Sequence, residues 1–266
     1  MSVEISSKDN HLYKKLKQLS KEKSEYLFIE GKKLFLEAVN SNLKIEAIYT
    51  DKKNKSFILN NISNKNNYEL IFMNNDLLST LFTTNSKPTT NELIITIAKK
   101  NLYTTEELIL SKKNLILLEG IQDPGNLGTI LRSAIAFDIN GIILTTGSAN
   151  PFNTKVIRAS AGATLKCKIA FLENDKNTIN SFKSLVKKNN YKIIATKTNS
   201  NKKLNELKLN LLNVFLFGNE GEGLSKDLLN IADETITIPH SLKVESLNVG
   251  TATSLILWEA YKKTIH

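Results

Sequence analysis

Short apolar runs recur between amphipathic and glycine-containing segments from residue 115 to the end of the chain. Such runs predict buried strands, and the segments between them have the periodicity of helices. The predicted strands are 115–118, 141–144, 192–195, 214–217 and 235–238, and the predicted helices are 127–137, 156–163, 224–231 and 248–263. Short apolar strands that alternate with helices indicate a parallel sheet covered on both faces, which is the α/β class.

The first hundred residues combine both patterns over shorter lengths. A helix is predicted at 30–40, because its apolar side chains fall on one face: Leu34, Phe35, Ala38 and Val39. The segment that starts at Ile45 alternates like a strand. Further predictions are a helix at 74–81 capped by Asn74 or Asn75, a polar loop at 83–92, a strand at 93–98, a partly helical linker at 99–112, and Asn/Lys-rich loops at 60–67 and 199–203.

Glycine is distributed unevenly along the chain. Ten of the eleven glycines lie between Gly120 and Gly250, and only Gly31 precedes them. This asymmetry indicates two domains of different construction. We place the first, with its linker, at residues 1–105 and the second at residues 106–266.

Composition narrows the class of protein. A hydrophobic content of 41% is typical of a packed core, and no apolar run approaches the length of a membrane span. The polar, acid-containing residues 1–10 do not resemble a signal peptide. The single cysteine, Cys167, excludes an intrachain disulfide, and His11, His240 and His266 lie too far apart to suggest metal-ligand spacing. We therefore expect a cytoplasmic protein without a metal.

The formal net charge of +10 is shared evenly between the two predicted domains. Residues 1–105 contain 16 Lys and 11 acidic residues, and the remainder contains 20 basic and 15 acidic residues, so each part carries +5. Such a surface favours polyanions, of which nucleic acid is the common one. A generally lysine-rich proteome would give the same surface, so the charge alone leaves both interpretations open.

Only two of the 36 basic residues are arginines, Arg132 and Arg158. An arginine retained in a chain that otherwise uses lysine suggests a site that needs the planar guanidinium. This group grips phosphate or carboxylate at two points, whereas lysine does not. We therefore consider both as candidate phosphate-binding residues, with two ordinary surface cations as the alternative.

Three segments that follow predicted strands have unusual sequences, at the position where open α/β sheets bind ligands. In residues 119–132 (EGIQDPGNLGTILR), a turn precedes Asn126, which is predicted to cap the next helix, and Arg132 follows within two helical turns. Residues 217–225 (FGNEGEGLS) place three glycines in six positions, which lets backbone groups contact a ligand. The pattern of this second segment is neither a Walker loop nor a Rossmann fingerprint.

The third segment, residues 238–248 (IPHSLKVESLN), brings Ser246 and Asn248 to the start of the last predicted helix. Asn248 is well placed to cap that helix. Each of the three segments alone is also explained as an ordinary turn or cap. Their joint order and spacing distinguishes them from chance.

NLGTILR, FGNEGEGLS and IPHSLKVESLNVGTATSL resemble the three motifs of the SpoU/TrmH family in the SPOUT superfamily. This resemblance covers residues 115–263, and it implies an RNA 2′-O-ribose methyltransferase that uses S-adenosylmethionine (SAM). Residues 24–98 resemble the small α/β substrate-binding domain, similar to certain RNA-binding ribosomal proteins, that precedes the catalytic domain in many members. FIEGKKLFLEAV and GSANPFNTKVIRASAGA are similar to members that modify large-subunit rRNA.

The resemblance further implies a parallel-sheet C-terminal domain with a trefoil knot and a homodimer whose active sites are completed by the partner chain. The last helix, 249–261, would lie in the dimer interface. SAM would bind within the knot, largely through backbone groups of Gly218, Ile238 and Leu247.

The implied catalytic residues all have the types that the family favours: Asn126, Arg132, Glu220, Ser246 and Asn248. Two departures from the family pattern are Gly250, where many members have serine, and His240–Ser241, where an apolar residue followed later by glycine is common. The second departure bears on the shape of the SAM loop.

Arg132 and Arg158 become the candidate RNA-binding residues once the substrate is RNA. Because a guanidinium stays protonated, we favour Arg132 as a stabiliser of phosphate and developing alkoxide over Arg132 as a base. We favour rRNA over tRNA as the substrate. The alternatives are a tRNA 2′-O-methyltransferase, a non-catalytic RNA-binding assembly factor of the same fold, a base-methylating SPOUT enzyme and a nucleotide-binding α/β enzyme.

Overall fold

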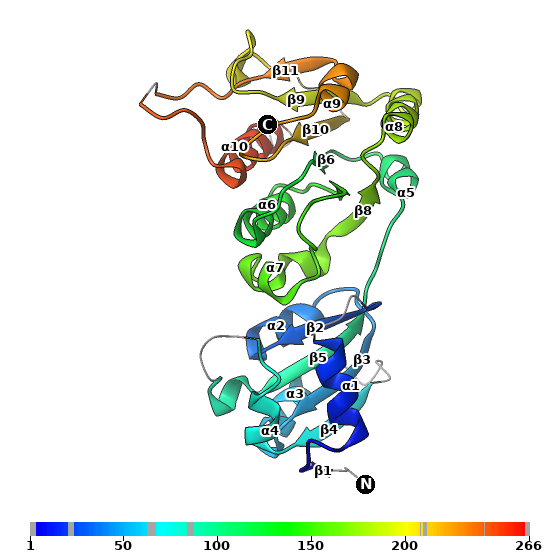
Figure 1. Ribbon diagram of the computed structural model, residues 1–266, viewed down its shortest axis with the longest axis vertical. Helices are drawn as coiled ribbons and strands as arrows, with labels where there is room; N and C mark the ends of the chain where they lie inside the picture. The colour runs from blue at the N-terminus through cyan, green and yellow to red at the C-terminus, as the bar shows by residue number, and fades with distance from the viewer. Residues whose placement is uncertain are drawn as a thin grey trace. The chain divides into compact units, whose positions relative to one another are not determined.

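The computed structural model describes residues 4–20, 24–62, 68–83, 88–207, 209, 212–241 and 243–263. The chain divides into two compact units, which we call the N-terminal and the C-terminal unit (Figure 1). The N-terminal unit comprises Met1–Asn101 together with Phe152–Lys166, and the C-terminal unit comprises Leu102–Pro151 and Cys167–His266. A segment from the second half of the sequence thus belongs to the first unit. The functional division at residue 105 stays a prediction.

The N-terminal unit is built on a five-stranded mixed sheet of order β1-β4-β3-β5-β2. Strand β5, which lies between β3 and β2, is antiparallel to both of these neighbours, and the other pairs are parallel. The strands are β1 (Glu4–Ile5), β2 (Tyr26–Glu30), β3 (Ile45–Thr50), β4 (Glu69–Met73) and β5 (Ile94–Lys99). The helices are α1 (His11–Leu19), α2 (Lys32–Val39), α3 (Lys55–Asn61), α4 (Asn75–Ser79) and α7 (Thr154–Ala159).

Helices cover both faces of this sheet, and its strands are therefore buried almost throughout. One core cluster packs α1 and α4 against the sheet, and another packs α2, α3 and α7 against it. Ile157 and Leu165 from the inserted segment belong to the second cluster. Gly162, with a φ of +87°, lies so close to α2 that a Cβ would meet Glu37 at 2.9 Å. The inserted segment therefore forms part of the N-terminal core.

The C-terminal unit contains six parallel strands in the order β11-β9-β10-β6-β7-β8, which confirms the predicted α/β class with a parallel sheet. The strands are β6 (Leu115–Leu118), β7 (Gly141–Thr145), β8 (Lys168–Leu172), β9 (Lys192–Thr196), β10 (Asn213–Phe217) and β11 (Glu234–Ile236). The helices are α5 (Thr105–Leu110), α6 (Pro124–Ala136), α8 (Lys176–Lys188), α9 (Lys226–Ile231) and α10 (Val249–Lys262). Short 3-10 helices occupy Lys52–Asn54, Thr90–Glu92, Ala163–Lys166 and Leu204–Glu206.

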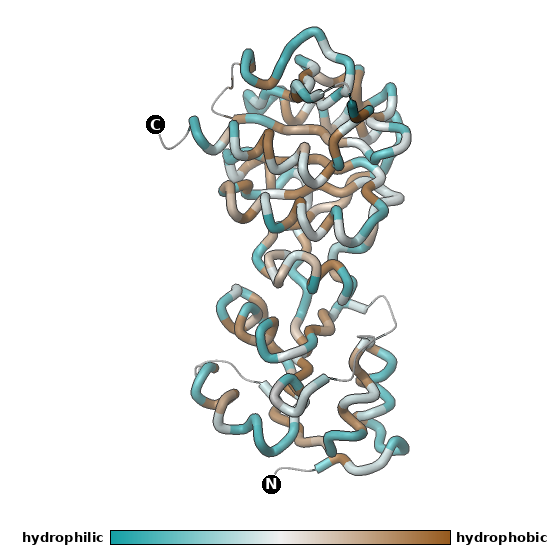
Figure 2. The backbone as a smooth tube through the Cα atoms, turned by 90° about the vertical axis from the view of Figure 1, so that its left-hand side faces the viewer, coloured by the Kyte–Doolittle hydropathy of each residue, from teal (hydrophilic) through white to brown (hydrophobic). Residues whose placement is uncertain are grey.

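Helices cover both faces of this sheet, as its apolar strands predict. Residues of α5, α8 and α9 pack on one face. In Figure 1, α6 and α10 lie beside each other on the side opposite α5 and α8. Hydrophobic positions follow the strands in the interior of the unit, and polar positions lie mainly on its outside (Figure 2). No helix in the described part of the chain is long and apolar enough to cross a membrane.

The predicted linker at 99–112 is partly helical, as expected, but its second half belongs to the core of the C-terminal unit. Residues 105–110 form α5, where the side chains of Leu108 and Ile109 are buried in the core of the C-terminal unit. Thr104 and Glu107 form a capping box that starts this helix. The segment is therefore helical because of its capping box, and it belongs to the core because Leu108 and Ile109 are buried there.

Candidate active site

Three loops leave the same edge of the C-terminal sheet. The central strands β6 and β10 are neighbours, so the loops after them, 119–123 and 218–225, emerge side by side. The loop after β11, 237–248, leaves the same edge because all strands are parallel. From β6 the chain adds β7 and then β8 on one side of this strand. The later strands β9, β10 and β11 lie on the other side of β6. The strand order thus reverses between β6 and β10, and open α/β sheets bind ligands at such switch points.

The first loop ends at α6, which begins earlier than the sequence suggests. The helix starts at Pro124, and its cap is Asp123, whose carboxylate accepts the backbone N–H of Asn126 at 2.7 Å. The prediction that Asn126 caps this helix is therefore wrong. Proline suits the first helical position because it has no N–H to leave unsatisfied, and the preceding aspartate then becomes the cap. Asn126 lies in the first turn with its side chain available for other contacts.

Asn126, Glu220 and Asn248 form a hydrogen-bonded network that joins the three loops. The Asn126 Nδ2 donates to Oε1 of Glu220. The Asn248 Nδ2 donates to Oδ1 of Asn126 at 2.8 Å. Asn248 also caps α10, as predicted, since its Oδ1 accepts the backbone N–H of Thr251 at 3.2 Å. Three of the five predicted catalytic residues are therefore in contact, although they lie up to 122 positions apart.

The conformation of the second loop depends on its glycines. The Asn219 Oδ1 accepts the backbone N–H groups of Gly221 and Glu222 at 3.0 and 2.7 Å, which closes a tight turn. A Cβ on Gly218 would lie 2.1 Å from the backbone carbon of Gly223, so the two arms of the loop touch there. Gly223 itself has a φ of +72°. Only glycine fits this close approach, and the turn presents Glu220 to Asn126.

Arg132 and Ser246 do not join the network. Arg132 is exposed on α6, and no hydrogen bond or ion pair joins it to another of the described residues. It follows Asn126 by six positions, which turns its side chain by about 240° around the helix. Ser246 is exposed in the third loop and likewise has no hydrogen-bond partner within the described ranges. Both side chains are therefore available to a ligand, and their predicted roles stay predictions.

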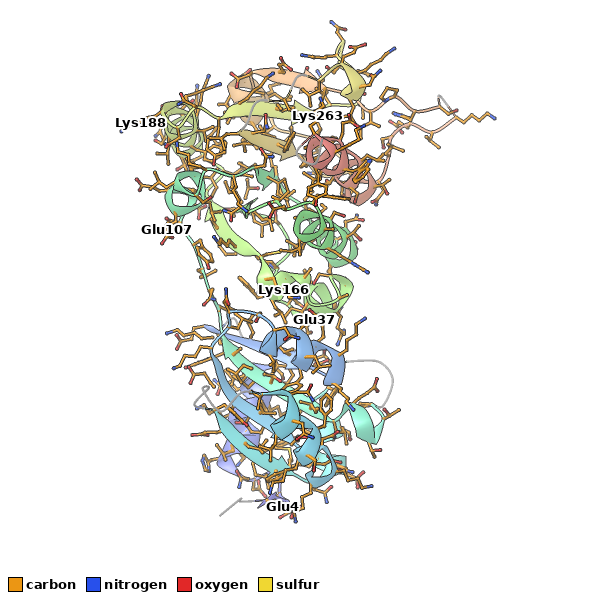
Figure 3. The ribbon with its side chains drawn as sticks, turned by 180° about the vertical axis from the view of Figure 1, so that it is seen from behind. Glu4, Glu37, Glu107, Lys166, Lys188 and Lys263 are labelled. Carbon is orange, nitrogen blue, oxygen red and sulfur yellow. The ribbon has the colours of Figure 1, made fainter. Side chains whose placement is uncertain are left out.

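Arg158 lies in the N-terminal unit and is held by that unit. Its Nη1 lies 2.7 Å from Oε2 of Glu30, a side chain only 2% exposed, and donates to Thr83 Oγ1 at 3.0 Å. The other carboxylate oxygen of Glu30 accepts the backbone N–H of Thr83 at 2.9 Å. Nearby, Lys166 and Glu37 form a second ion pair at 2.7 Å (Figure 3). RNA binding by Arg158 stays a prediction, and one edge of its guanidinium is already used.

The three positions predicted to contact SAM lie in the loops of the carboxyl edge. Gly218, Ile238 and Leu247 are half-buried and lie outside the helices and strands. The Ile238 carbonyl accepts the Nδ1–H of His240 at 2.8 Å, so the unusual histidine orders its own loop. The other departure, Gly250, lies where α10 approaches α6, and a Cβ there would meet Thr129 at 3.1 Å. Glycine thus allows a closer contact between α6 and α10 than serine would.

Two residues of the carboxyl edge have roles that the sequence interpretation missed. Asp123 caps α6, and an aspartate directly before Pro124 was a usable signal for it. Glu119 is a buried carboxylate at the end of β6 that bonds to the loops after β8 and β10. Its partners are distant in sequence, so no local pattern identifies it.

The fold and this edge define the class of protein, an α/β protein with a cluster of polar side chains at the switch point of a parallel sheet. A comparison with known protein families matches residues 113–258 to the SpoU rRNA Methylase family. The match covers more than half of the chain, and the chain belongs to this family. The predicted family membership is thereby confirmed.

Individual proteins resemble the chain over different lengths. An uncharacterized tRNA/rRNA methyltransferase from Synechocystis is 36% identical over 56% of this chain and 53% of that protein. A 23S rRNA (guanosine(2553)-2′-O)-methyltransferase from Bacillus subtilis is 28% identical over 58% of this chain and 60% of its own length. The chain thus spans little more than half the length of these curated relatives.

One solved structure has the same fold over almost the whole chain. The AdoMet-bound rRNA methyltransferase from Sinorhizobium meliloti has a TM-score of 0.84 and covers 98% of both chains at 23% sequence identity. At this identity the likeness concerns the fold.

Proposed function

We propose that the chain is a SAM-dependent RNA methyltransferase that methylates a ribose 2′-hydroxyl, with large-subunit rRNA as the preferred substrate. The observation that carries this proposal is the network of Asn126, Glu220 and Asn248, which joins the three family motifs at the switch point. The printed function of the Bacillus relative and the AdoMet bound to the Sinorhizobium protein support the reaction and the methyl donor.

The loops at the carboxyl edge suit a ligand held by backbone groups. Within the described part of the chain, no backbone–backbone hydrogen bond uses Gly218 or Leu247, so their N–H and C=O groups are available to a ligand. Gly218 also lies at the switch point itself, directly after β10. When bound there, SAM would supply a methyl group that is already activated by its sulfonium. Gly218, Ile238 and Leu247 would hold this cofactor.

The protein then has to position the ribose and stabilise charge on its oxygen. Methyl transfer is an in-line displacement, for which orientation of the two reactants is a large part of catalysis. The network fixes the Asn126 amide and the Glu220 carboxylate, which would orient the ribose or Arg132. Arg132 would bind the RNA phosphate and stabilise the oxygen as its proton leaves. Ser246 and Asn248 would hold the third loop and the substrate.

A homodimer would bury an exposed apolar face of the C-terminal unit. Ile135 of α6 and Leu255 and Trp258 of α10 are 36%, 41% and 44% exposed, and the Trp258 ring lies 5.8 Å from that of Phe137. Exposed apolar patches of this kind mark interaction sites. Arg132 precedes Ile135 by one helical turn and so borders this face, which supports an active site completed by the partner chain.

The N-terminal unit would bind RNA as a ribosomal-protein-like domain. Its covered five-stranded sheet and the net charge of +5 in residues 1–105 support this role. The trefoil knot in the C-terminal unit and a cytoplasmic location belong to the same proposal. A tRNA substrate is the alternative that the test below separates.

The test is methyl transfer from labelled SAM to unmodified rRNA and, separately, to tRNA, followed by nucleoside analysis. We expect a labelled 2′-O-methyl nucleoside from rRNA. The same nucleoside from tRNA alone would keep the reaction and replace the substrate. A labelled methyl group on a base would contradict the ribose proposal, and no transfer to any RNA would favour a non-catalytic assembly factor.

A further inference from the structure

Glu119 is a buried carboxylate at the centre of the carboxyl edge that has no role in the proposed chemistry. The residue follows β6 directly and is only 6% exposed. No lysine or arginine forms an ion pair with it among the described residues. A buried carboxylate without a cation is costly unless hydrogen bonds satisfy it, so its hydrogen-bond partners indicate its role.

Glu119 bonds to both ends of the glycine-rich loop. Its backbone N–H donates to the carbonyl of Phe217 at 2.8 Å, just before the loop begins. Its Oε2 accepts the backbone N–H of Ser225 at 2.7 Å, just after the turn. Its Oε1 accepts Nδ2 of Asn174 from the loop after β8 at 3.2 Å. One residue therefore clamps the segment 218–224 through the two residues that flank it, Phe217 and Ser225.

This loop gains order from an external contact because its glycines restrict the backbone little. Three of its residues are glycines, which lose more conformational freedom on ordering than any other residue. Internal hydrogen bonds join Asn219 to Gly221, Glu222 and Gly223, and they close the turn 219–223 without fixing it to the sheet. The arms meet at Gly218 and Gly223, and the bond from Glu119 to Ser225 holds the second arm in that contact.

We propose that Glu119 is a positioning residue, which fixes the loop 218–224 so that Gly218 and Glu220 meet cofactor and substrate. Glu119 acts as a hydrogen-bond acceptor for the Ser225 N–H, and its negative charge is not required. The inference rests on the proposed function, because that function gives the loop its ligands. That Glu119 clamps the loop 218–224 does not depend on the proposed function.

The variants Glu119→Ala and Glu119→Gln distinguish a need for the hydrogen-bond acceptor of Glu119 from a need for its negative charge. Alanine removes the acceptor and leaves the Ser225 N–H unsatisfied. Glutamine keeps one carbonyl oxygen for that N–H, and the exposed Asn174 can turn its amide to accept from the new NH₂ group. Asn174→Ala is the matched control, since it removes only the bond at 3.2 Å on the far side of the carboxylate.

A second pair of variants breaks the same bond from the other side. Ser225 has φ −60° and ψ 157°, which suit proline, and the proline Cδ would displace the Glu119 carboxylate that now accepts the Ser225 N–H. Ser225→Pro removes the N–H together with the Oγ cap of α9, whereas Ser225→Ala removes only the cap. The difference between these two variants reports the loss of the contact with Glu119, and it stays informative if Glu119→Ala fails to fold.

The readouts are hydrogen exchange of the backbone amides of 219–224 and the dissociation constant for SAM. We expect Glu119→Ala and Ser225→Pro to speed exchange and weaken SAM binding by about tenfold or more. We expect Glu119→Gln, Asn174→Ala and Ser225→Ala to stay within about threefold of the unmodified chain. Unchanged exchange in Glu119→Ala, or equal damage by alanine and glutamine, would overturn the proposal. If the unmodified chain binds no SAM, the proposed function fails, and the exchange rates still decide whether Glu119 clamps the loop.

Discussion

The two arginines of the chain differ in their contacts: the one in the N-terminal unit is paired, and the one in the C-terminal unit is exposed. In the N-terminal unit, Arg158 pairs with the buried carboxylate of Glu30 at 2.7 Å and is itself 29% exposed. In the C-terminal unit, Arg132 is exposed on α6 and forms no ion pair with the residues that the structure describes. Removal of the arginine that pairs with a buried carboxylate destabilises a fold, whereas an exposed arginine beside a candidate site is free to bind a phosphate. We therefore expect the two arginines to meet two different requirements.

Removal of the Arg132 side chain gives the largest expected effect on activity. We expect Arg132→Ala to lower single-turnover methyl transfer by about 10²–10³, because stabilisation of charge on the reacting oxygen is lost. The free energy of unfolding should change by less than about 0.5 kcal/mol, since the side chain is exposed and makes no bond there. Rapid-quench assays and urea unfolding measure the two quantities. A large loss of stability would erase the contrast with Arg158.

Removal of the Arg158 side chain should affect stability instead. We expect Arg158→Ala to lower the free energy of unfolding by about 3 kcal/mol, because the Glu30 carboxylate stays buried without a cation. The double variant with Glu30→Ala should lose less than the sum of the single variants. Urea unfolding measures both. A fully stable Arg158→Ala would contradict the role that we assign to this arginine in the fold.

Two glycines of the loop 218–225, Gly218 and Gly221, also differ in whether the structure requires them. We expect Gly218→Ala to destabilise the loop by about 1–3 kcal/mol and to weaken SAM binding, because the new Cβ would meet the backbone of Gly223 at 2.1 Å. Gly221→Ala is the matched control, since the nearest atom to its Cβ would lie at an ordinary 3.7 Å. Calorimetric titration with SAM compares the two. Equal affinities in both variants would contradict the touching arms of the loop.

The smallest expected effect concerns the cysteine. Burial raises the pKa of the Cys167 thiol to about 12, so almost no thiolate exists at pH 8. We expect the folded chain to resist iodoacetamide at this pH and to react once it is unfolded in urea. Mass spectrometry measures the modified fraction. Fast modification of the folded chain would show that the C-terminal unit opens readily.

The sequence predicted many elements whose apolar residues are contiguous or follow a motif, but it missed the apolar strands β2, β4 and β8. The strands β6, β7, β9 and β10 were found because each is a nearly unbroken apolar run. The cap of α10 was also found, since Asn248 precedes the apolar pattern of the helix. The helix α8 was missed, because its buried positions, Ile179, Phe182 and Val186, are isolated among lysine, asparagine and serine. In such a segment the composition conceals the helical spacing.

The candidate site was predicted in its residues and only partly in its geometry. The motifs identified Asn126, Glu220 and Asn248, and the structure joins them by hydrogen bonds. The partner of Arg158 could not be predicted, because Glu30 lies 128 positions away and no local pattern connects the two. Glu119 was missed for the same reason. Contacts between loops of different strands depend on strand order, which periodicity does not specify.

The most direct test compares conservative changes at the two arginines in one assay. Single-turnover transfer from labelled SAM to unmodified large-subunit rRNA is measured for Arg132→Lys and Arg158→Lys, together with the unfolding midpoint of each. We predict that Arg132→Lys folds normally and loses most of its rate, because a point charge does not replace the planar guanidinium. Arg158→Lys should lose stability and keep its rate in the folded fraction. Near-normal transfer by Arg132→Lys, or a loss of rate only in Arg158→Lys, would contradict the account.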